Sequence, residues 1–170
     1  MFRVLITFLL LAFFGLSIQS TATHMFSVYA SGPNLLLLLA IFIGLKNHKP
    51  SGAIGAFLIG LLGDFASAKY LGPSAAGTLV AYCLTVILSQ RVYAEHPVTL
   101  AMVALLCSLA RSVVYVLFLS MYVSSNIFSL ETLKGVAFEA FLTAIVAPIV
   151  FKIIKWALGK PKHSNSMVYR

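Results

Sequence analysis

The chain has 170 residues, of which 61% are hydrophobic and only 9% are charged, and its formal net charge is +8. A soluble domain carries roughly a quarter charged residues, so this composition excludes a soluble globular protein and indicates an integral membrane protein. The apolar runs are unbroken rather than alternating, which argues against a transmembrane β-barrel. The basic residues gather at the ends of apolar segments, with no basic stripe interleaved with aromatic residues, which argues against nucleic-acid binding.

Six apolar segments predict an all-α integral membrane protein with six transmembrane helices in one bundle. The predicted spans are residues 2–18, 29–45, 51–65, 74–90, 98–123 and 135–158. A span needs about 20 residues to cross roughly 30 Å of hydrocarbon. The third and fourth are shorter, so they must extend into flanking residues or lie where the bilayer is thin. We expect one transmembrane domain over residues 1–160 and a short basic cytoplasmic tail at residues 161–170.

Prolines stand at or just before the first turn of four predicted spans, where a missing N–H group costs nothing. They are Pro33, Pro50, Pro73 and Pro97. The first segment, followed by "STA" at residues 20–22, also resembles a signal peptide with a small-residue cleavage site. Retention is favoured over cleavage because only one basic residue, Arg3, precedes the apolar run.

Lysines and arginines alternate between the two sides of the predicted bundle. One side holds Arg3, Lys46, Lys49, Arg91, Lys152, Lys155, Lys160, Lys162 and Arg170, and the other side holds Lys69 and Lys134. Cytoplasmic loops carry the excess of positive residues. The pattern therefore predicts that both termini face the cytoplasm.

The third span carries small residues three or four positions apart, at Gly52, Ala56, Gly60 and Gly63. This spacing places them on one helix face, where the backbone of another helix can approach closely. Internal packing within the bundle is the favoured interpretation. A face for a partner protein is the alternative.

Two charges of opposite sign are expected at matching depth in the membrane. Asp64 lies 13 residues after Ser51, and Arg111 lies 13 residues after Val98, where the third and fifth spans enter from the cytoplasm. A charge near the bilayer centre costs at least ~2.5–3.5 kcal/mol, so Arg111 should face the interior and find a partner. We predict a structural ion pair in which Asp64 neutralises Arg111, with Glu139 as the alternative or second acid. A ligand or proton path through an outer-half cavity, and an Arg111 that extends outward unpaired, remain open.

The last span contains Pro148, which removes one helical hydrogen bond and predicts a kink. A group of basic and aromatic residues follows and is typical of an anchor on an anionic cytoplasmic leaflet. These residues are Lys152, Lys155, Trp156, Lys160 and Lys162. A docking site for a cytoplasmic protein is the alternative.

Catalysis has little support in the sequence. There is no pair of carboxylates on one helix, no HExxH motif and no phosphate-binding loop. The four histidines fall in predicted loops or the tail, and Cys83 and Cys107 fall inside apolar segments as packing residues do. We therefore expect no catalytic residues, no metal and no cofactor.

Four stretches, taken in order, are similar to the bacterial family of the rod shape-determining protein MreD. They are "QST" at residues 19–21, "PNLLLLL" at 33–39, "GAFLIGLLGDF" at 55–65 with "LG" at 71–72, and "LTAIVAPIVF" at 142–151. Two positions depart from the family pattern. Asn34 stands where Asp is frequent, and Tyr70 stands where Pro is usual.

This resemblance implies a non-enzymatic inner-membrane member of the rod complex, which controls cell shape by directing lateral peptidoglycan synthesis. Its partners would be MreC and, through the complex, MreB, RodA and its transpeptidase. The resemblance also implies a fold like the substrate-binding subunit of energy-coupling-factor vitamin transporters. A small-molecule-binding subunit of such a transporter is therefore the alternative function.

Overall fold

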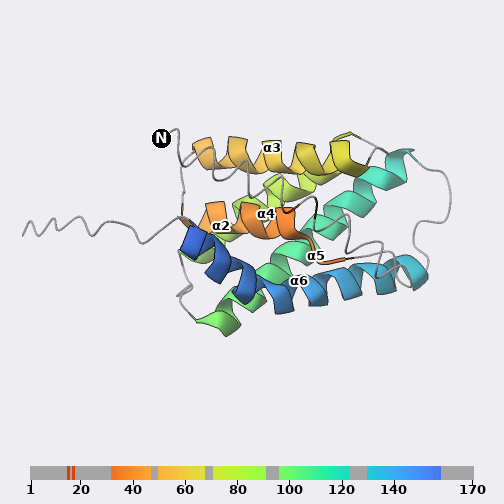
Figure 1. The fold of residues 1–170 in the computed structure, drawn as a ribbon. Coiled ribbons are helices and arrows are strands. Elements are labelled where there is room, and N and C mark those ends of the chain that lie inside the picture. Colours follow the sequence, from red (N-terminus) through yellow and green to blue (C-terminus); the bar gives the residue numbers. More distant parts are fainter. Residues whose placement is uncertain are drawn as a thin grey trace, which may run out of the picture.

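Five helices make up the described part of the chain, and these residues contain no strand (Figure 1). The computed structural model describes residues 15, 17, 32–46, 50–67, 71–90, 96–122 and 130–157. The helices are α2 (Leu35–Lys46), α3 (Pro50–Ser67), α4 (Pro73–Ser89), α5 (Pro97–Tyr122) and α6 (Leu130–Ala157). The all-α prediction is confirmed. Of the predicted first span, only Gly15 and Ser17 are described, so a six-helix bundle stays a prediction.

Two of the helices are long and apolar enough to cross a membrane, over Pro97–Phe118 in α5 and Leu133–Trp156 in α6. Helices α2, α3 and α4 are apolar but shorter. The 12 residues of α2 extend only about 18 Å at 1.5 Å per residue. The sequence predicted a longer second span that begins at residue 29. That start is wrong, because residues 32–34 are not helical and α2 begins at Leu35.

The short helix α2 forms the centre of the bundle. It contacts α3, α4, α5 and α6 (Figure 1), and eight of its 12 residues are buried. Leu37, Leu38 and Ile41 are fully buried, at 0% exposure. A helix that is apolar on every side is suited to such a position, because no face of it can meet water. The leucine run therefore fills the core.

Local signals explain where the helices start. Helices α3, α4 and α5 begin at Pro50, Pro73 and Pro97, as the sequence predicts, because proline fits the first helical position. Helix α6 continues through Pro148. Figure 1 shows that α6 bends toward the end of α2 in its C-terminal part.

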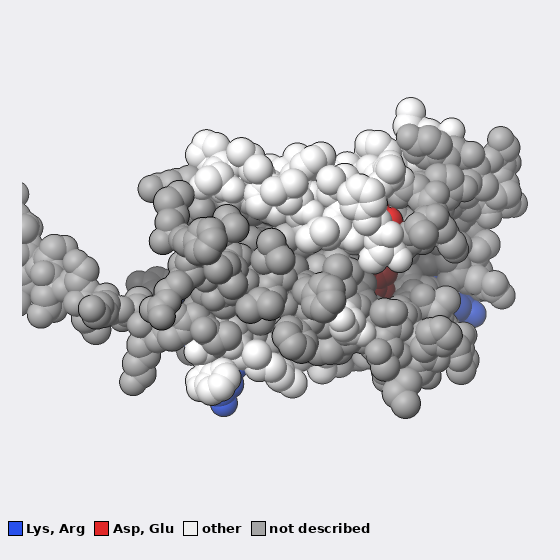
Figure 2. Space-filling model, turned by 45° about the horizontal axis from the view of Figure 1, so that its top comes forward, with Lys and Arg blue, Asp and Glu red and all other residues white. Residues whose placement is uncertain are grey.

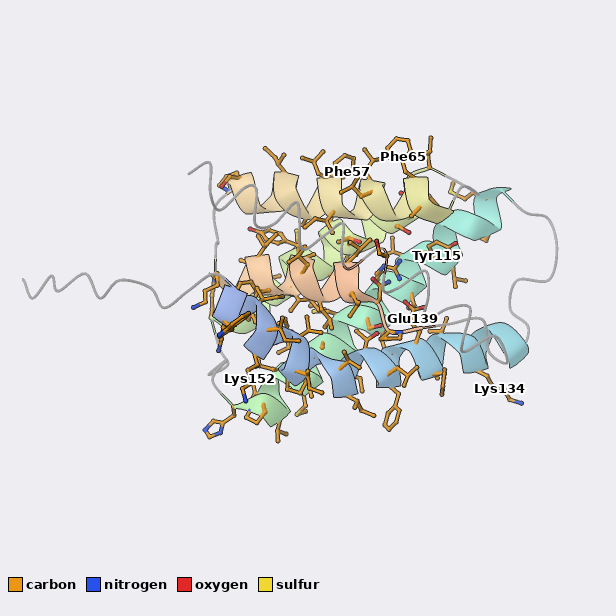
Figure 3. All side chains as sticks on the ribbon, in the orientation of Figure 1. Phe57, Phe65, Tyr115, Lys134, Glu139 and Lys152 are labelled. Carbon is orange, nitrogen blue, oxygen red and sulfur yellow. The ribbon has the colours of Figure 1, made fainter. Side chains whose placement is uncertain are left out.

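The outward faces of the helices are also apolar. Phe57 and Phe65 of α3 are exposed and point away from the bundle (Figure 3). The other large exposed apolar residues include Ile54, Leu58, Met102, Leu106, Val113, Leu117, Phe141, Ile145, Ile149 and Ile153. Apolar residues on the inside and outside of the same helices are typical of a protein surrounded by lipid.

Candidate functional site

Asp64 caps the start of helix α4. Its carboxylate is 2% exposed and lies in the last turn of α3. It accepts hydrogen bonds from the backbone N–H groups of Gly72 (2.9 Å), Ser74 (2.9 Å) and Ala75 (3.1 Å). The first N–H groups of a helix lack partners within the helix and carry a partial positive charge, so a carboxylate is stabilising there.

Gly72 makes this arrangement possible. Its φ of +115° is a conformation that residues with a side chain rarely adopt. Glycine in this conformation lets the chain turn into α4 with its N–H group directed at Asp64. One carboxylate thereby joins the end of α3 to the beginning of α4.

Arg111 of α5 pairs with Glu139 of α6. The Nη1 atom lies 3.1 Å from Oε1 of Glu139, and the two side chains are 13% and 20% exposed. The Nη2 atom donates a longer hydrogen bond, at 3.4 Å, to Oγ of Ser74. Arg111 also lies against the ring of Tyr115, with 5.9 Å between the guanidinium carbon and the ring centre. A mostly buried guanidinium is thus matched by one carboxylate and one aromatic face.

Gly77 lets α4 and α5 approach closely at this point. A Cβ atom on Gly77 would lie 2.9 Å from Cγ of Arg111 and 3.1 Å from its carbonyl oxygen. No side chain fits there without a shift of Arg111. Glycine at residue 77 is therefore part of the Arg111 site.

Glu139 also holds the start of the central helix. Its Oε1 atom accepts a second hydrogen bond, from Nδ2 of Asn34 at 3.1 Å. Asn34 in turn caps α2, because its Oδ1 atom accepts from the N–H group of Leu37 at 3.0 Å. The N–H group of Asn34 donates to Oγ1 of Thr143 at 3.1 Å, and that hydroxyl donates to the carbonyl of Glu139 at 2.7 Å. The buried start of α2 is thus hydrogen-bonded to α6.

These contacts form one polar network that involves all five described helices. Its members are Asn34, Asp64, Gly72, Ser74, Arg111, Glu139 and Thr143. Ser74 is the link between its halves, since its N–H group donates to Asp64 and its hydroxyl accepts from Arg111. In Figure 2, acidic atoms are visible on this face beside described residues without charge.

The predicted pairing of Asp64 with Arg111 is wrong. Among the described residues, Arg111 forms its ion pair with Glu139, which was the alternative acid. The physical reason is that Asp64 faces the N–H groups at the start of α4, only eight residues beyond it in the chain. These donors occupy both of its oxygens. The two charges do lie in the same region, because Ser74 contacts both.

Three side chains in the network were absent from the sequence-based site, namely Asn34, Ser74 and Thr143. Asn34 carried a usable signal, because asparagine directly before an apolar run is a typical N-cap. Ser74 follows the Gly-Pro pair at the start of α4, which marks a helix beginning but gives no partner. Thr143 lies in the middle of an apolar helix, where no local pattern reveals its contact with Asn34.

The whole chain, and not only the residues of the network, was compared with known proteins. The model of a family described as rod shape-determining protein MreD matches residues 1–157. The chain belongs to the MreD family. No curated protein matches it, and no solved structure does either. Members of this family are membrane proteins of rod shape determination, and the resemblance found in the sequence is confirmed.

The small-residue face of this MreD family member lies inside the bundle. A Cβ atom on Gly60 would lie 2.6 Å from Cα of Ala75, so α3 and α4 meet at backbone distance there. Gly63 faces Leu36 of α2, and Ala56 is fully buried in a cluster with Ala40 and Tyr82. Gly52 is buried as well. This placement favours the packing interpretation over a partner face.

The C-terminal anchor is described only in part. Lys152, Lys155 and Trp156 are exposed at the end of α6, whereas Lys160 and Lys162 lie outside the described residues. The described residues contain no group of three or more His, Cys, Asp and Glu side chains that could hold a metal ion.

Proposed function

We propose that this protein is a non-enzymatic component of the bacterial inner membrane that holds the rod complex together during lateral peptidoglycan synthesis. It would span the membrane several times, with both termini in the cytoplasm. Its direct partner would be MreC, and MreB, RodA and the transpeptidase of RodA would be reached through the complex. The family supports the role in rod shape, and the remaining statements are the proposal.

The polar network is the observation that carries the scaffold proposal. A scaffold must present its outer faces in a fixed arrangement, and each of the five described helices contributes to the network. Arg111 is only 13% exposed and contacts α4 and α6 at once. In an apolar surrounding, such polar contacts fix the relative positions of helices because any other arrangement leaves a charge unpaired.

The positions of the lysines support the proposed topology. Lys46 ends α2 and Lys155 lies in the last turn of α6, whereas Asp64 and Glu139 lie in the network at the opposite end. The basic end would face the cytoplasm by the excess of positive charge. The network would then lie in the outer half of the membrane.

The alternative function, a vitamin-binding transporter subunit, requires a cavity for the ligand in the bundle. The described centre of the bundle is instead filled by fully buried side chains of α2, such as Leu37 and Leu38. This packing favours the scaffold over the binding subunit.

Co-purification from native membranes tests the proposal. A tagged chain, expressed at native level in a strain that lacks the untagged protein, should restore rod shape and recover MreC. Arg111→Leu combined with Glu139→Leu removes the ion pair without leaving an unpaired charge. Recovery of MreC with this double variant tests whether the network fixes the faces that bind the partner. Recovery of a vitamin with the chain, and of no rod-complex protein, would contradict the proposal.

A further inference from the structure

The cytoplasmic end of the proposed topology gathers lysines from two helices that are far apart in the sequence. Lys46 is in the last turn of α2, and Lys152 and Lys155 are in the last two turns of α6. All three side chains are exposed. We call these three residues the basic end.

The packing of α2 on α6 brings these lysines to one level. The two helices run in the same direction, since Asn34 contacts Thr143 at one end and Phe42 contacts Phe151 at the other. The two phenylalanine rings lie 6.0 Å apart between centres. Lys46 and Lys155 each follow one of these rings by four residues, about one helical turn. Lys46 and Lys155 therefore lie at the same level of the bundle, one turn beyond the contact between the two rings.

The partial charges of the helix ends at this side are too small to neutralise the three lysines. Each helix terminus carries about half an elementary charge. The C-terminal ends of α2, α4 and α6 and the N-terminal ends of α3 and α5 lie on this side, so their sum is about −0.5. Among the described residues, the three lysines bring the net charge of this end to about +2.5. No acid of the described residues offsets this charge. Asp64 and Glu139 lie in the polar network, and Glu131 lies in the first turn of α6, at the opposite end from Lys155.

The neighbouring surface of α6 is suited to lipid. Ile149 and Ile153 are exposed on α6, and Trp156 follows at the spacing of the same helix face. Trp156 is 85% exposed. Tryptophan is enriched at the level of lipid headgroups, where its ring meets both apolar chains and water. A protein partner would need an acidic surface, but it would leave the isoleucines below the headgroup level without a role.

We propose that the basic end binds the headgroup of an anionic phospholipid, whose acyl chains lie along Ile149 and Ile153 of α6. Lys46, Lys152 and Lys155 contact the phosphate oxygens, and Trp156 packs at the glycerol level. A headgroup with two phosphodiesters offers two negative charges, which matches the positive excess of the described residues at this end better than a headgroup with one. The bound lipid thereby joins the central helix to α6 at the membrane surface.

Native mass spectrometry of the purified full chain tests this proposal. The detergent-solubilised protein is offered diphosphatidylglycerol, phosphatidylglycerol, phosphatidylcholine or inorganic phosphate, and bound molecules are counted. We expect the protein to retain diphosphatidylglycerol in preference to phosphatidylglycerol. It should retain neither phosphatidylcholine nor inorganic phosphate. Each Lys→Gln change at residues 46, 152 and 155 should weaken binding roughly fivefold, equivalent to about 1 kcal/mol per lysine.

Lys134 provides the matched control, because it is an exposed lysine of the same helix at the opposite end (Figure 3). Lys134→Gln should leave lipid binding unchanged. Equal thermal unfolding of all variants in lipid-free detergent verifies that they are folded. The proposal is overturned if the triple variant binds like the unchanged chain, if Lys134→Gln loses as much, or if crosslinks from residue 152 in membranes reach an acidic protein in place of lipid. Because the assay uses the chain alone, it is independent of whether MreC is its partner.

Discussion

Asn34 and Arg111 share one oxygen atom of Glu139. The amide of Asn34 and the guanidinium of Arg111 each lie 3.1 Å from Oε1 of that carboxylate. Asn34 begins the central helix, whereas Arg111 and Glu139 belong to the two helices long enough to cross a membrane. A single carboxylate therefore couples the position of α2 to the pairing of α5 with α6.

The first prediction concerns this carboxylate. Glu139→Ala leaves Arg111 in the bundle without a counter-charge and removes the acceptor of Asn34. Loss of one partner of a buried pair typically costs ~3–5 kcal/mol, whereas replacement of both by apolar residues can be nearly neutral. Glu139→Ala should thus strongly lower the amount of folded protein in membranes, and Glu139→Leu with Arg111→Leu should recover much of it. Thermal unfolding in detergent and protein level in membranes are the measurements.

Asp64 supplies the control for that cycle. Since it does not pair with Arg111, Asp64→Ala combined with Arg111→Leu should be at least as unstable as either single change. Recovery in this double variant, at the level seen with Glu139, would contradict the assignment of the ion pair.

The second prediction concerns the cap on α4. Asp64→Ala leaves three N–H groups without their acceptor, and each buried donor without a partner costs about 1–3 kcal/mol. Asp64→Asn keeps one carbonyl oxygen and loses the charge. The midpoint of thermal unfolding should therefore be highest for the unchanged chain, lower for Asp64→Asn and lowest for Asp64→Ala. Ala66→Ser, at an exposed position two residues further along α3, should have little effect, and an equal loss there would refute a capping role.

The third prediction concerns topology. A reporter fused after Arg170 should read cytoplasmic, and one inserted within residues 124–129, between α5 and α6, should read periplasmic. The reason is the excess of lysine and arginine on the side that includes Lys152 and Lys155. Activity of a periplasmic reporter at the C-terminus would rule out the six-span arrangement.

Local features of the sequence predicted the helices better than the contacts between them. Pro50, Pro73 and Pro97 marked three helix starts, because the effect of proline on a first turn needs no partner. Helix rise predicted that Asp64 and Arg111 lie near each other, and both contact Ser74. Which acid Arg111 meets depends on helix rotation and on the position of α4. Neither of these follows from counting residues along a span.

The length of α2 shows the same limit. A run of leucines looks like a membrane span whether it crosses the bilayer or stops halfway. Helix α2 begins at Leu35 because Asn34 caps its first turn. Asn34 is itself held by hydrogen bonds to Thr143 and Glu139, more than 100 residues later in the chain. Only the folded arrangement brings these acceptors and donors together.

The last prediction concerns the close approach of α3 and α4 at Gly60. A methyl group there would lie 2.6 Å from Cα of Ala75 and 2.8 Å from the carbonyl oxygen of Ser74, and both are backbone atoms that cannot rotate away. Gly60→Ala must therefore push the helices apart, with an expected loss of ~1–3 kcal/mol. The shift also moves Ser74, which donates to Asp64 and accepts from Arg111.

Gly55 of the same helix is the matched control, since its nearest neighbour beyond the local chain is the flexible tip of Ile43 at 3.9 Å. Gly55→Ala should be neutral or stabilising by up to about 1 kcal/mol, because alanine favours a helix more than glycine does. Thermal unfolding and the level of folded protein distinguish the two variants, and Gly60→Leu should in addition disturb rod shape or the recovery of MreC. If Gly60→Ala and Gly55→Ala unfold at the same temperature, α3 and α4 do not meet as closely as the structure shows.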